Sequence, residues 1–183
     1  MTVIACVLIC YCIFTLIPNK YKIVYNHASY AFDISDYRQL AVRYRYIFVG
    51  RVDSFEKYEY EDEHGNYDFI SSKYYVTPLM NIQGNLEIGQ KLLWEKEGGL
   101  TKSGLYYSML SGDIIPEEGK LYVICTRAID DGSVLFSSGA NSAIELEKGI
   151  NKDNLSDSEV VNRMISACES PNYYTDFYIT PST

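Results

Sequence analysis

The hydrophobic pattern divides the chain into an apolar N-terminal run and a longer region of alternating apolar and polar positions. Residues 3–17 carry no charged side chain, and the run ends at Pro18-Asn19-Lys20. As a helix, this run is slightly shorter than the hydrocarbon core of a bilayer, which is about 30 Å thick. We therefore predict a transmembrane or signal-anchor helix over residues 1–18, followed by a linker over residues 19–32.

The flanks of this run give mixed signals about its processing and orientation. No Lys or Arg precedes it, and Lys20 and Lys22 follow it, which favours a cytoplasmic C-terminal side. Cys6 ends a segment similar to a lipoprotein cleavage box, which makes it a candidate lipidation site, but the box stands too close to Met1 for an apolar run to precede it. Because no small-x-small cleavage site follows closely, we expect the segment to be retained.

Residues 33–150 show first a helical and then a strand period. Ile34, Tyr37, Leu40 and Ala41 share one face, which predicts a short helix over residues 33–43 that Asp33 or Ser35 could cap. Alternation then predicts a first strand over residues 44–52, and runs of strand-forming residues between turns predict strands over residues 69–80, 91–97, 105–110, 120–129, 134–136 and 143–146. Strands at such regular spacing predict a small antiparallel β-barrel.

Three features refine this barrel. Gly50 lies in the middle of the first strand and predicts a bulge, and Pro78 predicts an edge position. Residues 56–68 predict a long hairpin that turns near Gly65. Residues 151–183 predict a C-terminal helix and tail packed on the barrel: Ser156 and Glu159 match a capping box, and the apolar stripe is Val160, Val161, Met164, Ile165 and Cys168.

Composition changes the picture in two ways. The net charge is −8, and residues 23–183 hold 14 basic against 24 acidic side chains, which excludes the basic surface that nucleic-acid binding requires. The chain also holds 18 Tyr. These rings either pack across strands or form an interaction surface for protein or sugar. The candidate residues for such a surface are Tyr58, Tyr60, Tyr67, Tyr74, Tyr75, Tyr106 and Tyr107.

Chemistry-bearing residues form no recognisable catalytic or metal motif, so we predict no enzyme, no metal and no cofactor. Cys125 and Cys168 are expected to be buried thiols, with a disulfide between them as the alternative. A Cys125–His64 nucleophile pair is formally available, and residues 112–121 only superficially match a phosphate loop. An acidic stretch could hold calcium but is more simply a solvated loop, and it comprises Glu59, Glu61, Asp62, Glu63 and Asp68.

The stretch from Tyr46 to Leu146 resembles a widespread group of uncharacterised exported or membrane-anchored proteins of Gram-positive bacteria. The matching pieces are Tyr46-Ile-Phe-Val-Gly-Arg-Val52, Asn81-Ile-Gln-Gly-Asn-Leu86, Glu97-Gly-Gly99, Gly112-Asp113, Pro116-Glu-Glu-Gly-Lys-Leu-Tyr122 and Gly139-Ala-Asn-Ser-Ala-Ile-Glu-Leu146. The resemblance implies an OB-like barrel related to netrin and tissue-inhibitor modules. It implies no catalytic residues, and the N-terminal cysteines with which those modules inhibit metalloproteases are missing.

These expectations combine into a mainly β protein of the cell membrane, with its domain on the extracytoplasmic side. We expect a non-catalytic binding module whose partner is an unknown protein or a cell-wall glycan, held to the membrane by residues 1–18. Two alternatives stay open. One is a carboxylate-based hydrolase of the cell envelope, which would need two acids facing each other in a cleft. The other is a structural part of a surface complex, which would show a large exposed apolar patch.

Overall fold

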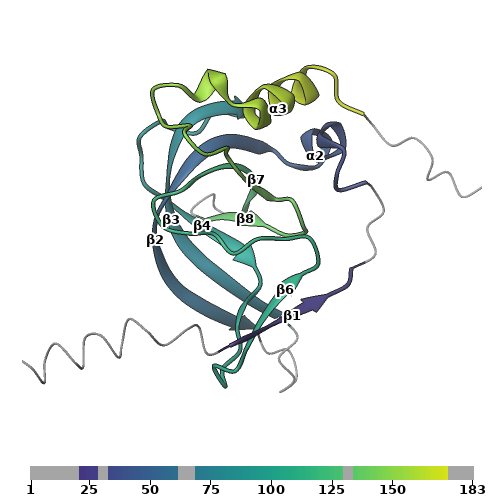
Figure 1. The fold of residues 1–183 in the computed structure, drawn as a ribbon, viewed down its shortest axis with the longest axis vertical. Coiled ribbons are helices and arrows are strands. Elements are labelled where there is room, and N and C mark those ends of the chain that lie inside the picture. The colour runs from purple at the N-terminus through teal and green to yellow at the C-terminus, as the bar shows by residue number, and fades with distance from the viewer. Residues whose placement is uncertain (1–20, 29–32, 62–68, 130–133, 173–183) are drawn as a thin grey trace, which may run out of the picture.

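The computed structural model describes residues 21–28, 33–61, 69–129 and 134–172, and within them the protein is mainly β with a C-terminal helix (Figure 1). The elements, in chain order, are β1 (Lys22–Asn26), α2 (Tyr37–Arg43), β2 (Tyr46–Glu61), β3 (Phe69–Gln83), β4 (Leu92–Glu97), β5 (Gly99–Leu100), β6 (Tyr106–Leu110), β7 (Leu121–Ile129), β8 (Val134–Ser137), β9 (Ala143–Glu145), the 3-10 turn η1 (Leu155–Asp157) and α3 (Glu159–Glu169). The seven strands predicted between residues 44 and 146, the short helix before them and the C-terminal helix are present.

Strand pairing links five of these strands in a ring. β2 pairs with β3, β3 with β4, β4 with β8, β8 with β7, and β7 again with β2. The expectation of an entirely antiparallel sheet is wrong at one place, because β4 and β8 run parallel. β9 pairs with the same stretch of β7 that pairs with β2, Tyr122 to Ile124, and therefore lies on the opposite edge of β7 from β2.

The bulge expected at Gly50 is confirmed. The β2–β3 register shifts between Val49 and Gly50, and a Cβ at Gly50 would stand 2.8 Å from the Phe48 ring and 3.0 Å from Ile124. Pro78 lies opposite Gly50 and beyond the last β3 residue that pairs with β4, Val76, so its missing N–H leaves that ladder intact. Further shifts bend the long β2–β3 hairpin, whose turn at residues 62–68 lies outside the described residues.

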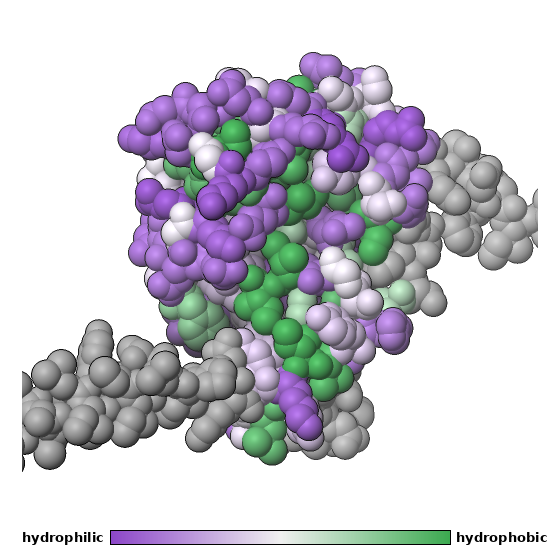
Figure 2. All heavy atoms as spheres, viewed as in Figure 1, coloured by the Kyte–Doolittle hydropathy of each residue, from purple (hydrophilic) through white to green (hydrophobic). Residues whose placement is uncertain are grey.

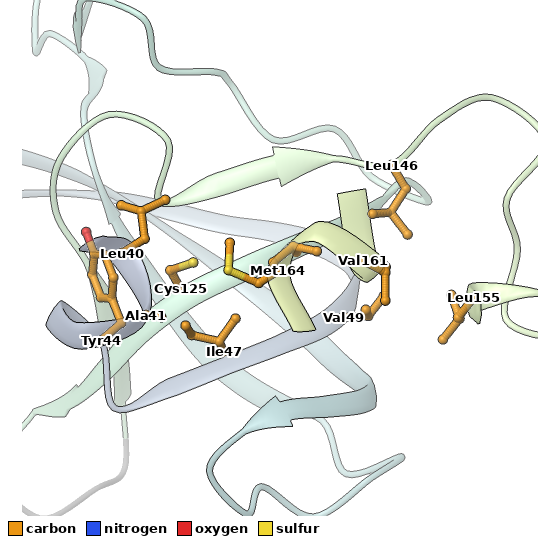
Figure 3. Close-up of a cluster of buried hydrophobic side chains, with 11 residues drawn as sticks. Leu40, Ala41, Tyr44, Ile47, Val49, Cys125, Leu146, Leu155, Val161 and Met164 are labelled. Atoms are coloured by element: carbon orange, nitrogen blue, oxygen red, sulfur yellow. The ribbon is translucent and has the colours of Figure 1, made fainter. Parts of the chain in front are cut away.

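The two helices close one end of this ring by apolar packing. Figure 3 shows Met164 and Val161 of α3 next to Cys125 of β7 and to Ile47 and Val49 of β2, with α2 at the side. A second buried cluster lies between the strands and holds Phe48, Val52, Tyr74, Val76, Trp94, Tyr122, Ile124, Leu135 and Ala143. The predicted packing of the C-terminal helix is therefore present through residue 169.

The helix caps differ from those expected. Ser158, not Ser156, accepts a hydrogen bond from the backbone N–H of Val161, at 3.2 Å, and α3 begins at Glu159. The Ser158 hydroxyl also donates to Glu147 at 2.6 Å, a contact eleven residues back along the chain that a local motif cannot show. At α2 the cap is Asp36 rather than Asp33 or Ser35.

A second, three-stranded sheet has the order β1-β6-β5, with β1 parallel to β6. It lies at the end of the molecule opposite α3 (Figure 1). β1 occupies residues that were expected to belong to a linker. The predicted anchor at residues 1–18 lies outside the described residues, and among the helices that the structure describes none is long and apolar enough to cross a membrane.

Candidate functional site

The predicted tyrosine surface divides into rings that belong to the core and rings that remain accessible. Tyr74 and Tyr107 are almost fully buried, and Tyr58, Tyr60 and Tyr75 are half-buried. Tyr106 is exposed on β6. Tyr67 and the candidate lipidation site Cys6 lie outside the described residues. The seven tyrosines are therefore not one open platform, because two of the six described rings face inward.

The structure does bring part of this set into a row of touching rings. Phe55 lies 4.6 Å from Tyr58, Tyr58 lies 6.2 Å from Tyr107, and Tyr107 lies 5.5 Å from Tyr21, measured between ring centroids. Such tilted and edge-on contacts are favourable beyond simple burial. Burial raises the pKa of Tyr58 to about 12, so its hydroxyl is not an acid near neutral pH. The row joins the β2–β3 hairpin to the small sheet.

Beside this row lies a buried polar cluster. Lys96 of β4 forms an ion pair with Asp113, and both side chains are almost completely buried. The Ser72 hydroxyl donates to the Gly98 carbonyl at 2.6 Å and lies 3.3 Å from the Tyr107 hydroxyl. Burial raises the pKa of Asp113 from its ordinary value, although Lys96 opposes this rise. Each of these polar groups has an ion-pair or hydrogen-bond partner within the cluster, which fits a structural role better than a catalytic one.

All five residues of β1 are exposed, and the open side of this strand is called here the β1 edge. In parallel strands, residues in register point to the same face, so Ile23 and Tyr25 share the inward face of Tyr107 and Met109. Tyr107 and Met109 are 4% and 5% exposed, yet Ile23 and Tyr25 are 44% and 54% exposed. The row of inward-facing side chains on β6 therefore continues on β1 as Ile23 and Tyr25, and these two side chains are exposed. They are called here the inward row of β1.

The backbone of β1 is also unpaired along the β1 edge, the side that faces away from β6. Lys22 N–H donates to Leu105 and Asn26 C=O accepts from Ser111, both at 2.9 Å. Because a parallel ladder alternates, the backbone groups of Ile23 and Tyr25 point away from β6. Within the described part of the chain, β1 pairs with β6 alone. Sequence reasoning missed this edge, although Ile23-Val24-Tyr25 is a run of strand-forming residues.

Exposed apolar residues extend from the β1 edge to the neighbouring turn. Leu105 and Tyr106 are 57% and 44% exposed at the start of β6, beside Lys22. Figure 2 shows hydrophobic residues running down the centre of this face toward the end where β6 and β1 lie, whereas the surface around α3 is mostly hydrophilic. Neither Tyr21–Asn26 nor Leu105–Leu110 contains an acidic residue, in a chain that has 24 of them.

The described surface also has hollows, one between the helices and one next to β1 and β6. A groove of about 630 Å³ separates α2 from α3, and Arg163 lies 4.7 Å over the Tyr37 ring on its wall. Its other charged residues include Asp36, Arg38 and Glu159, so both signs of charge are mixed. A polar cavity of about 340 Å³ is lined by Asn26, Glu97 and Ser108 among others. Burial raises the pKa of Glu97, whose carboxylate accepts a 3.3 Å hydrogen bond from Gly139 N–H.

The candidate nucleophile and part of the possible calcium loop lie within the described residues. Cys125 is fully buried, and burial raises the pKa of its thiol well above the ordinary value, which makes it inert. Cys125 and Cys168 are both free, so the alternative disulfide is not formed. Glu59 is paired with Lys73, and no group of three metal-ligating side chains occurs among the described residues. Glu61 is exposed at the end of β2, whereas His64, Asp62, Glu63 and Asp68 lie outside the described residues.

Comparison with known proteins gives no family for this chain: no family model matches it, and no curated protein is significantly similar to it. Function must therefore be argued from the site itself.

Proposed function

We propose that this protein is a non-catalytic, membrane-tethered interaction module that binds an extended segment of a protein along the β1 edge. The tether is the apolar run at residues 3–17, and the domain faces the extracytoplasmic side. The order of the five-strand ring, β2-β3-β4-β8-β7, supports an OB-like barrel as the scaffold. The likeness to exported barrel proteins of Gram-positive bacteria is part of this proposal.

The observation that carries the proposal is the uncovered inward row of Ile23 and Tyr25. A strand edge with free N–H and C=O groups and apolar side chains is a liability, which proteins ordinarily blunt with charge, bulges or a covering element. The described edge has no bulge and no described element that covers it, and its one charged residue, Lys22, stands at its beginning. Addition of a strand would pair the free backbone groups and cover the apolar row together.

A protein segment fits this site better than a glycan. Sugar binding by stacking needs open aromatic faces, but Tyr74 and Tyr107 are buried and Tyr58 is packed between Phe55 and Tyr107. Backbone pairing along an edge is available to a polypeptide and not to a sugar. The acidic balance of the domain argues against nucleic acid as the partner.

Site-specific photo-crosslinking of the full chain in its native membrane tests the proposal. A photoreactive phenylalanine at Tyr25 should form protein adducts, whereas the same group at Ile88, an exposed residue on the turn before β4, should not. Ile23→Pro should abolish the Tyr25 adducts, since it removes an outward N–H while sparing the β1–β6 bonds. Adducts with lipid alone, or equal adducts at both positions, would refute binding at the β1 edge.

The orientation is tested separately. Protease added to intact protoplasts should digest the domain if residues 23–183 lie outside the cytoplasmic membrane. Full protection would instead support the orientation favoured by Lys20 and Lys22, with the domain in the cytoplasm.

A further inference from the structure

We infer that the segment bound at the β1 edge is the β1 strand of a second copy of this chain, paired antiparallel about a two-fold axis at Val24. This inference rests on the proposed function and names the partner of the same site. It predicts a continuous sheet in the order β5-β6-β1, followed by the same strands of the second copy in reverse.

The backbone of the β1 edge is complementary to itself. Its outward groups belong to Ile23 and Tyr25, which flank Val24 symmetrically. With the axis at Val24, Ile23 of each copy lies opposite Tyr25 of the other. Each such pair exchanges an N–H and a C=O in both directions, as hydrogen-bonded pairs of antiparallel strands do. Both outward residues of each copy are therefore fully paired, with none left over.

The side chains agree with this register. Ile23 meets Tyr25 of the other copy on the uncovered inward face, a pairing of a β-branched and an aromatic residue that stabilises antiparallel strands. Lys22 meets Asn26 rather than another Lys22, so no like charges oppose each other. A chain of net charge −8 repels its own copies, and neither β1 nor β6 adds an acidic side chain to that repulsion.

Two arguments favour a second copy over other occupants. A lipid surface cannot serve the free backbone groups, because hydrocarbon offers them no hydrogen-bond partner. A second copy on the same membrane is also held at high effective concentration, since β1 begins at Lys22, shortly after the apolar run ends at residue 17. Dimerisation through an isologous patch is the commonest form of protein self-assembly.

The register makes a sharp test by disulfide trapping in the full chain. Cys6, Cys10 and Cys12 are first replaced by Ala to leave the anchor without thiols. Val24 pairs with itself across the axis at a Cα separation of about 4.5 Å, which suits a disulfide. Under mild oxidation in membranes, Val24→Cys should therefore give roughly tenfold more linked dimer than Ile23→Cys, whose two copies lie beyond disulfide reach.

Three controls keep the test decisive. Ile88→Cys, exposed on a distant turn, measures random collision. The parent chain without the new cysteine measures any contribution from Cys168. Adding Ile23→Pro to Val24→Cys should suppress the dimer, while the fluorescence of buried Trp94 reports that the domain still folds.

The outcomes separate this inference from the proposed function. Dimer at Val24 and little at Ile23 supports the two-fold pairing. Equal trapping at all positions, or none, refutes it. If trapping fails but Tyr25 still crosslinks to another protein in an Ile23-dependent way, strand addition stands and only the identity of the partner is wrong. If both fail, both proposals fall.

Discussion

The two ends of this molecule differ in how far the strands are covered by other elements. At the α3 end, the helices cover the strands, and Val161 and Met164 are fully buried on Cys125 and Ile47. At the β1 end, a small sheet covers an interior of Ser72, Lys96, Asp113 and Tyr107, and its own last strand stays open. The comparison indicates that apolar packing of helices closes the α3 end, whereas at the β1 end one edge of the small sheet has no described partner strand.

The largest expected effect comes from placing a charge at each end. Met164→Asp should lower the free energy of unfolding by about 3–5 kcal/mol, because it buries an unpaired carboxylate. Tyr25→Asp, on the exposed strand, should change it by less than about 0.5 kcal/mol in the monomer. Urea unfolding followed by Trp94 fluorescence measures both. Similar losses for the two variants would show that the β1 end is as closed as the other.

The buried ion pair gives the next largest effect. Asp113→Ala leaves the Lys96 ammonium buried without its partner and should destabilise the protein by about 3–5 kcal/mol. Lys96→Met in the same chain should recover most of that loss, because no buried charge then remains. The same unfolding experiment, run as a double-mutant cycle, measures the recovery. A double variant as unstable as Asp113→Ala alone would contradict a charge-pair role.

Sequence reasoning succeeded where local alternation decides the structure. β7 begins with a continuous run of β-forming apolar residues from Leu121 to Cys125, β3 alternates buried and half-buried positions from Ser72 to Pro78, and Gly50 signals its bulge within the strand itself. The C-terminal helix was visible from the spacing of Val161, Met164 and Ile165. In these regions the type of element follows from residues that are close together in the sequence.

The missed features depend on partners far away in the chain. β1 is five residues long and exposed throughout, so no alternation of burial marks it. The parallel β4–β8 pairing follows from the path of three intervening strands, which no local pattern records. Lys96 carries a residue type that is ordinarily solvated, and only Asp113, seventeen positions away, explains its burial. The uncovered row on β1 becomes visible only once Tyr107 and Met109 are known to lie beside it.

A smaller effect distinguishes the two serines that could begin α3. Ser158→Ala should cost about 1 kcal/mol, because it removes the bond from Val161 N–H and the bond to Glu147. Ser156→Ala should stay within about 0.5 kcal/mol, since that side chain caps no helix. Chemical unfolding of both variants is the measurement. A larger loss of stability for Ser156→Ala than for Ser158→Ala would show that Ser156 caps the helix.

The smallest effect is a pH dependence beside the polar cavity at the β1 end. Burial raises the folded-state pKa of Glu97 above the ordinary value of 4.5, so the folded protein favours the protonated acid. The resulting stability is fully present below pH 4.5 and is lost as the pH rises through the raised pKa. The stability of Glu97→Gln should therefore match that of the wild type at pH 4 and exceed it at pH 7, because an amide stays neutral and can still accept the hydrogen bond from Gly139.

The control is Glu87→Gln, on an exposed turn, which removes the same charge from a position where the carboxylate is not buried. Urea midpoints at both pH values measure the difference, and equal gains for the two variants would show that net charge, not the closure of this end of the molecule, sets the effect.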